Sequence, residues 1–343
     1  MNGPTIHQRI CLAALLGLSL LGAGCTTQNR QDQAVEHYIR GQLLLDQGQT
    51  QAALEELAKA VGADPALSVA RSAMGDLYRR QGQHELAGRA YEAAVQANPY
   101  TFRTQYNLAL TYQTLADQAK LAAKVREYLE KAVAVYQRAL ELQPSDFDSH
   151  VNLAVCHFQL GQKDEARQHS QEAVRLDPKS AKARANLGII YDSEGDLYEA
   201  ISAYKAAMEL RPNDPDLLMK LGQAYIKQGR LRPAISTFEH AGKVAPRESW
   251  PWEKLAECNY YAGQYEASLE KYRQAIEVNG HSCVGYRGLG VVYMTQFVKD
   301  PQREDLRDKG LEAWHASLEI NSNQPDLRRL VEKYSPKLNR PAL

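Results

Sequence analysis

The residues with the clearest chemical potential are a group of cysteines and histidines and a glycine cluster near the C-terminal end. His281, Cys283 and Cys258 carry metal-ligating atoms, but the chain has only five cysteines and no CxxC pair, so the spacing of a zinc site is missing. The glycines at 285–290 read GxxGxG, which is the wrong order for a dinucleotide-binding loop. No P-loop, HExxH or GxSxG motif occurs. The sequence therefore predicts no catalytic residue, no metal site and no cofactor.

A second group consists of three asparagines in the same local motif. Asn107, Asn152 and Asn186 are each followed by leucine and then by alanine or glycine. An amide side chain carries an acceptor oxygen and two donor hydrogens, so a series of amides can pair with the backbone of an extended peptide. The motif therefore indicates peptide binding as a function to be tested.

The length and net charge of the chain narrow the classes of protein to which it can belong. A chain of 343 residues can form two ordinary domains or one repeat array. Its 41 basic residues balance 41 acidic ones, so the summed charge gives no long-range attraction to nucleic acid. We expect protein partners, with no nucleic acid and no small-molecule substrate.

Two residue types mark a repeat. Glycines recur at a spacing of 34 residues, at Gly48 and Gly82 and again at Gly161, Gly195, Gly229 and Gly263. Prolines keep the same spacing, at Pro65 and Pro99 and again at Pro144, Pro178, Pro212 and Pro246. The step from Pro99 to Pro144 is 45 residues, so 11 extra residues lie between them. A repeat of this length is one supersecondary unit that must stack on its neighbours to bury an apolar face.

Within one repeat, residues 181–214, the pattern is that of two helices and a turn. Gly188 and Ala200 are small, which lets two helices approach closely. Gly195 supplies the left-handed conformation that ends the first helix, and Pro212 prevents the second from continuing.

This pattern resembles the tetratricopeptide repeat (TPR). The resemblance implies an all-α fold, a right-handed superhelical TPR solenoid of about eight helix-turn-helix repeats with a C-terminal capping helix. The predicted repeats are 34–67, 68–101, 102–146, 147–180, 181–214, 215–248, 249–282 and 283–324, and a capping helix and tail follow at 325–343.

Two repeats carry additional residues between their helices. The segment near 116–127 is rich in helix formers, so we expect longer helices there. Residues 298–305 are charged and contain Pro301, which predicts an exposed loop. Both additions would lie at the same edge of the repeat stack. A functional edge and a tolerated surface insertion are both open interpretations.

The TPR resemblance also implies a concave groove made by the first helices. Asn107, Asn152 and Asn186 take the sixth position of their repeats, which tends to face that groove in TPR proteins. We expect them to bind a partner; the alternative is that asparagine is simply common at this position.

Aromatic residues at groove positions are candidate anchors for a partner. They are Phe158, Trp250, Tyr260, Tyr261 and Tyr286. The alternative is that these side chains pack between repeats.

The N-terminal residues differ in kind from the repeats. His7 and Arg9 precede an apolar run, residues 10–21, which is followed by Gly22-Ala23-Gly24 and Cys25. This resembles a bacterial lipoprotein signal peptide, although Gly22 stands where that family prefers leucine. The resemblance implies removal of residues 1–24, attachment of lipid, including palmitate, at Cys25, and a short tether at 25–33. The alternative is an ordinary secretory signal.

We therefore expect a non-catalytic scaffold of the bacterial cell envelope that binds partner polypeptides in its groove during assembly or secretion of an envelope complex. Thr26 and Thr27 follow the cysteine where an inner-membrane retention signal would place aspartate, which favours the outer membrane, facing the periplasm. Two alternatives stay open. One is a soluble exported, chaperone-like binder of extended chains, and the other is an accessory subunit that delivers substrate to a separate enzyme.

Overall fold

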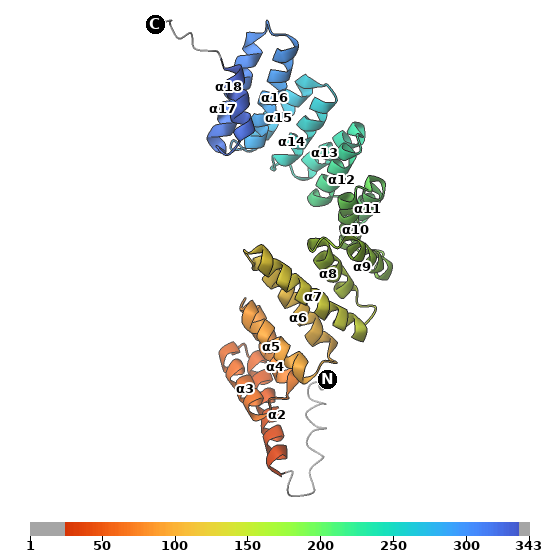
Figure 1. The fold of residues 1–343 in the computed structure, drawn as a ribbon, viewed down its shortest axis with the longest axis vertical. Helices are drawn as coiled ribbons and strands as arrows, with labels where there is room; N and C mark the ends of the chain where they lie inside the picture. Colours follow the sequence, from red (N-terminus) through yellow and green to blue (C-terminus); the bar gives the residue numbers. More distant parts are fainter. Residues whose placement is uncertain (1–24, 336–343) are drawn as a thin grey trace, which may run out of the picture. The chain divides into compact units, whose positions relative to one another are not determined.

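The computed structural model describes residues 25–335, and all of its regular structure within that range is helical. The predicted signal peptide at 1–24 and the last residues of the predicted tail lie outside the described residues. Seventeen helices, α2 to α18, follow one another in the described range (Figure 1). None of these helices is both long and apolar enough to cross a bilayer. The all-α TPR fold predicted from the sequence is confirmed.

The chain divides into two compact units at Leu160, inside the predicted repeat 147–180. The helices of the N-terminal unit are α2 (Cys25–Asp46), α3 (Thr50–Ala63), α4 (Ser68–Arg80), α5 (His84–Ala97), α6 (Phe102–Gln118), α7 (Ala122–Leu142) and α8 (Phe147–Gln159). Those of the C-terminal unit are α9 (Lys163–Leu176), α10 (Ala181–Glu194), α11 (Leu197–Leu210), α12 (Pro215–Lys227), α13 (Leu231–Val244), α14 (Trp250–Tyr261), α15 (Tyr265–Val278), α16 (Cys283–Lys299), α17 (Glu304–Ile320) and α18 (Pro325–Tyr334).

Six glycines form the turns between paired helices. Their φ angles lie between 73° and 88°, at Gly48, Gly82, Gly161, Gly195, Gly229 and Gly263. A residue with a Cβ atom adopts this left-handed conformation only at an energetic cost. The role predicted for the turn glycines is confirmed.

Close contact between a glycine and an aromatic ring holds the two helices of a hairpin together. A Cβ atom on Gly188 would lie 2.7 Å from the ring of Tyr204, and one on Gly75 would lie 2.7 Å from the ring of Tyr91. Both rings are almost completely buried, with exposed fractions of 1% and 0%. The aromatic ring therefore fills the space that the missing side chain leaves, as the pattern at Gly188 predicts.

The eleven additional residues of the third repeat extend both of its helices. Helix α6 has 17 residues and α7 has 21, whereas α4 and α5 have 13 and 14. The differences of four and seven residues account for all eleven. The prediction of longer helices near 116–127 is confirmed.

The exposed loop predicted for residues 298–305 is confirmed for 300–303 and is wrong for the other half, residues 298, 299, 304 and 305, which are helical. Helix α16 continues to Lys299 and α17 begins at Glu304, so only residues 300–303 connect them. Leu306 explains the early start of α17, because its side chain is 8% exposed and packs into a core cluster. The charged side chains beside Leu306 pair with one another at the surface. Nε of Arg303 lies 2.8 Å from Oδ1 of Asp305.

The two ends of the described chain are helical. Helix α2 begins at Cys25, so the tether expected at 25–33 is part of a helix and spans about 13 Å at 1.5 Å per residue. At the other end, α18 covers the last hairpin as predicted. Leu327 and Val331 are buried in a cluster with Trp314, while Leu330 is 37% exposed.

Candidate functional site

A groove cavity of about 320 Å³ opens on the first helices of three successive hairpins in the N-terminal unit. Helix α2 contributes Tyr38 and Gln42, α4 contributes Ser72 and Asp76, and α6 contributes Arg103. These are the positions that the TPR resemblance assigns to a concave surface. We name this cavity the α2–α4–α6 groove.

Asp76 is fixed at the floor of the groove by two donors from different helices. The hydroxyl of Tyr91 on α5 donates to its Oδ1 at 2.5 Å, and Nδ2 of Asn107 on α6 donates to the same oxygen at 3.0 Å. Burial, followed by the hydrogen bond to Asp76, raises the pKa of Tyr91 far above its ordinary value. Tyr91 therefore stays a donor at neutral pH, and the carboxylate is held in one orientation.

Two arginines lie near the carboxylate of Asp76 at longer distances, one beside each oxygen. A guanidinium nitrogen of Arg103 lies 3.6 Å from Oδ2, and one of Arg79 lies 3.8 Å from Oδ1. The Arg103 side chain is 76% exposed, so most of its hydrogen-bonding capacity faces solvent. Between these groups, the hydroxyls of Ser72 and Thr104 are 3.2 Å apart and join α4 to α6. The groove thus presents a fixed carboxylate and an exposed guanidinium side by side.

Two of the three predicted asparagines bridge neighbouring helices in the N-terminal unit. Asn107 is 7% exposed and uses its amide nitrogen on Asp76. The amide nitrogen of Asn152 on α8 donates to the hydroxyl of Tyr106 on α6 at 3.2 Å. Asn186 lies on α10 of the C-terminal unit, where its amide nitrogen is buried and has no hydrogen-bond partner. The repeated motif therefore joins adjacent first helices at 107 and 152.

Beyond Asp76 the first helices of the N-terminal unit become aromatic. The rings of Phe102 and Tyr106 on α6 stack at a centroid distance of 6.0 Å, and Tyr106 rests edge-on against the buried ring of Tyr136 on α7 at 5.9 Å. Phe158 on α8 is half-buried. The surface formed by these helices thus changes from polar at α4 to aromatic at α6.

In the C-terminal unit, aromatic residues cluster at the C-terminal end of α14. Tyr260 contacts Tyr261 at a centroid distance of 5.6 Å and Tyr265 at 5.9 Å. The hydroxyls of Tyr260 and Thr295 are 3.0 Å apart, which ties α14 to α16. Tyr261 is 57% exposed. Of the tyrosines predicted as anchors, Tyr261 has the surface available for a partner, whereas Tyr260 is engaged within the fold.

The other two aromatic anchors predicted in these repeats, Trp250 and Tyr286, are half-buried. Trp250 begins α14, ten residues before Tyr260, which separates them by about 15 Å along the helix. It is half-buried and packs against the core cluster of α11 to α14. Tyr286 is half-buried on α16. Trp250 is therefore separated from the tyrosine cluster along α14.

Three cysteines, Cys156, Cys258 and Cys283, are free thiols. Burial raises the pKa of Cys156 to about 12, and burial with a smaller contribution from Glu257 raises the pKa of Cys258 to about 12. Both are therefore protonated and unreactive at neutral pH. Within residues 25–335, no cluster of histidine, cysteine, aspartate or glutamate has the arrangement of a metal site.

The glycine cluster at 285–290 serves helix packing. A Cβ atom on Gly288 would lie 2.2 Å from the Tyr272 ring, and one on Gly290 would lie 2.3 Å from the Trp314 ring. These glycines let α16 approach α15 and α17, so their spacing follows from the helix geometry.

Comparison with known protein families agrees with this architecture. The model of the cilia and flagella-associated protein 70 C-terminal domain, a TPR domain, matches residues 28–284, more than half of the chain. The chain belongs to this TPR family. No curated protein matches it.

Solved structures of TPR proteins resemble this TPR chain. The C-terminal part of a TPR repeat-containing protein from Cytophaga hutchinsonii shares 17% identity with a TM-score of 0.60, covering 74% of this chain and 97% of that one. A tetratricopeptide repeat protein from Parabacteroides merdae shares 18% identity with a TM-score of 0.51, covering 76% of this chain and 99% of that one. At these identities the likeness shows the fold alone.

The site residues that sequence reasoning missed are Asp76, Arg103 and Tyr106. Each lies at a groove position of its repeat, so the TPR register contained the signal. Their importance comes from partners on other helices, such as Tyr91 for Asp76, and a single repeat does not show those partners.

Proposed function

We propose that this TPR protein is a non-catalytic scaffold that holds an extended segment of a partner protein in the α2–α4–α6 groove. The observation that carries the proposal is the pairing of a fixed carboxylate, Asp76, with the exposed guanidinium of Arg103. A peptide backbone offers both N–H donors and C=O acceptors. The carboxylate can accept from the former and the guanidinium can donate to the latter or to an acidic side chain.

The proposed setting is the bacterial cell envelope, with the chain tethered through lipid on Cys25 to the periplasmic face of the outer membrane. The support is the sequence of residues 7–25, with its basic start, short apolar run and small residues before the cysteine. The protein would act in assembly or secretion of an envelope complex. Because α2 starts at Cys25, the groove would stand close to the lipid surface.

Other settings compete with this one. A soluble exported binder of extended chains would need the same groove without the lipid, and an accessory subunit would deliver the bound chain to a separate enzyme. The family takes its name from a cilia and flagella-associated protein, which gives a ciliary scaffold as a further alternative. The basic and apolar residues before Cys25 favour the envelope.

The test of the tether is expression of the full chain in a bacterial host, followed by membrane fractionation and mass spectrometry of the mature N-terminus. The proposal predicts a diacylglyceryl cysteine at residue 25 and recovery in the outer membrane. Cys25→Ser should move the protein to the soluble fraction or leave an uncleaved precursor. An intact N-terminus on the wild-type protein would refute the envelope setting while leaving the groove proposal untouched.

The test of the groove is a pull-down from detergent-solubilised membranes, comparing wild type with Arg103→Glu. Loss of a discrete set of proteins with Arg103→Glu is the expected result. The matched control is Arg126→Glu, which changes an arginine of similar exposure, 73%, outside the groove. Equal recovery of partners by both variants would contradict the groove as the binding surface.

A further inference from the structure

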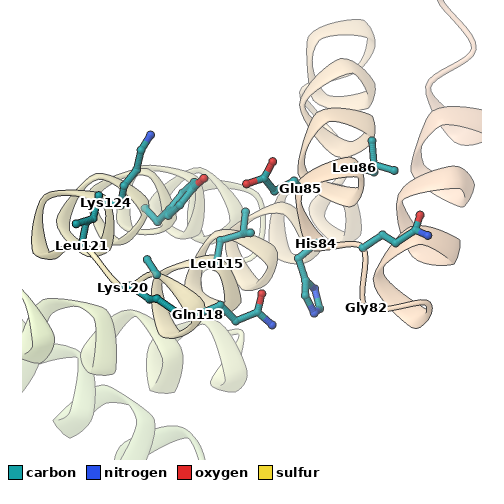
Figure 2. A pocket seen from close by; sticks show the side chains of 12 residues that line it. Gly82, His84, Glu85, Leu86, Leu115, Gln118, Lys120, Leu121 and Lys124 are labelled. Carbon is teal, nitrogen blue, oxygen red and sulfur yellow. The ribbon is translucent and has the colours of Figure 1, made fainter.

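A second cavity in the N-terminal unit exists because neighbouring hairpins differ in length. The α4–α5 hairpin turns at Gly82, whereas α6 and α7 extend four and seven residues further. At 1.5 Å per residue, α7 therefore projects about 10 Å beyond its neighbour. A pocket of about 750 Å³ occupies the resulting step, between the start of α5 and the α6–α7 turn (Figure 2). We name it the step pocket.

Apolar side chains line the step pocket where a solvated helix surface would be polar. Leu121 in the α6–α7 turn is 68% exposed, and Leu86 on α5 is 43% exposed. Leu115 and Tyr128 also line the pocket. Exposed apolar residues that meet at one cavity are characteristic of protein-binding surfaces.

Polar groups of the pocket are incompletely paired. On α7, Lys124 and Lys131 both bind Glu127, at 3.0 Å and 2.8 Å. Lys120 in the turn takes part in neither pair and is exposed, with no carboxylate partner in the part of the chain that the structure describes. Glu85, on the opposite wall, lies close enough to Lys124 to interact with it electrostatically. The uncompensated charge of the pocket is therefore the ammonium of Lys120.

One ring nitrogen of His84, a residue that lines the pocket, has no hydrogen-bond partner. This atom, Nδ1, is shielded from solvent. His84 opens α5 and is one of the residues around the pocket in Figure 2. A buried polar atom without a partner costs free energy.

We propose that the step pocket is a docking site for a partner protein segment that carries aliphatic side chains next to acidic residues. The aliphatic groups would cover Leu121 and Leu86, and the acidic group would pair with Lys120. The site lies at the hairpin edge and shares no lining residue with the α2–α4–α6 groove, so it is independent of the proposed groove function.

The experiment uses a short synthetic peptide with leucines flanked by aspartates and a counterpart with lysines in place of the aspartates. Affinity for the full chain is measured by isothermal titration calorimetry. We expect the acidic peptide to bind at least about tenfold more tightly than the lysine peptide. Leu121→Asp and Lys120→Glu should each weaken binding by about tenfold or more.

Matched controls separate the pocket from general charge and apolarity. Leu43→Asp changes a leucine that is 55% exposed on α2, and Lys205→Glu changes an exposed lysine on α11. Both should leave the affinity unchanged. Because Leu121 and Lys120 are exposed, their variants should fold normally, as circular dichroism will verify.

The location is tested by photo-crosslinking the acidic peptide and mapping the adduct. Crosslinks within residues 82–86 or 115–128 support the proposal, and crosslinks within residues 38–45, 68–80 or 101–104 would assign binding to the groove instead. No binding of the acidic peptide, equal affinity for the lysine peptide, or unchanged binding to Leu121→Asp would overturn it.

Discussion

The phenol of Tyr91 donates a 2.5 Å hydrogen bond to Oδ1 of Asp76, and so a second-helix residue orients a carboxylate on the groove surface of the neighbouring first helix. Tyr91 is fully buried beneath Gly75. The packing that closes this hairpin is therefore also the packing that positions its groove carboxylate.

Asp76→Ala should destabilise the protein by about 1–3 kcal/mol, because it leaves the buried hydroxyl of Tyr91 and the amide of Asn107 without their acceptor. Urea denaturation followed by circular dichroism measures the change. Asp46→Ala, at an exposed aspartate of α2, is the control and should change stability by less than about 0.5 kcal/mol. Equal effects of the two substitutions would show that Asp76 is not integral to the fold.

Stability should fall at alkaline pH because of buried tyrosines. Burial raises the pKa of Tyr204 well above its ordinary value. Above about pH 10 an unfolded tyrosine loses its proton while the folded one keeps it, so the unfolded state binds fewer protons and the free energy of unfolding decreases with pH. This contribution is complete below about pH 10 and is lost as the pH rises through the folded pKa.

Tyr204→Phe tests this directly, since it keeps the ring and removes the titrating hydroxyl. Above about pH 10 the free energy of unfolding of the wild type should fall with pH. In Tyr204→Phe we expect this slope to be smaller by about 1.4 kcal/mol per pH unit. Denaturation curves from pH 8 to pH 11 provide the measurement. Tyr198→Phe, at a tyrosine that is 79% exposed, should leave the slope as it is in the wild type.

Gly290→Ala should destabilise the last hairpin by about 1–3 kcal/mol, because its Cβ would lie 2.3 Å from Trp314 and 2.9 Å from the backbone oxygen of Gly310. Gly62→Ala is the matched control on α3, where a Cβ would meet nothing within 4 Å. It should stabilise by about 0.5–1 kcal/mol. We expect Gly290→Ala to lower the melting temperature and Gly62→Ala to raise it. A higher melting temperature for Gly290→Ala would refute the packing role.

Tyr261→Ala and Tyr260→Ala should separate binding from stability in the aromatic cluster. Tyr261 is 57% exposed, so its truncation should cost less than about 1 kcal/mol of stability. Tyr260 packs against Tyr265 and bonds Thr295, so its truncation should cost about 2–4 kcal/mol. If Tyr261 is a partner anchor, Tyr261→Ala weakens partner recovery while thermal melts stay close to wild type. Unchanged recovery would exclude the anchor role.

The repeat architecture could be predicted from sequence because backbone geometry fixes its landmarks. Gly195 must take a left-handed conformation and Pro212 must follow a helix, and these requirements recur every 34 residues. The loop predicted at 298–305 is shorter in the structure, residues 300–303, because Pro301 and the charges beside it favour a loop only locally. The buried side chain of Leu306, which pulls α17 forward, depends on contacts with other helices.

The candidate sites were less predictable. The motif at Asn107 shows which face of the helix the amide occupies, but the acceptor, Asp76, lies 31 residues earlier on another helix. The step pocket depends on the length difference between two neighbouring hairpins. The sequence revealed the additional residues, whereas the apolar wall facing α5 appeared only in the structure.

The longer third hairpin also limits how its length can vary among related chains. Four and seven residues are close to one and two full turns of an α-helix, so α6 and α7 keep the same angular phase before and after the extension. One further residue in either helix would rotate everything beyond it by about 100° and turn Leu115 or Tyr128 away from α5. Length changes in this hairpin should therefore occur in steps of three, four or seven residues.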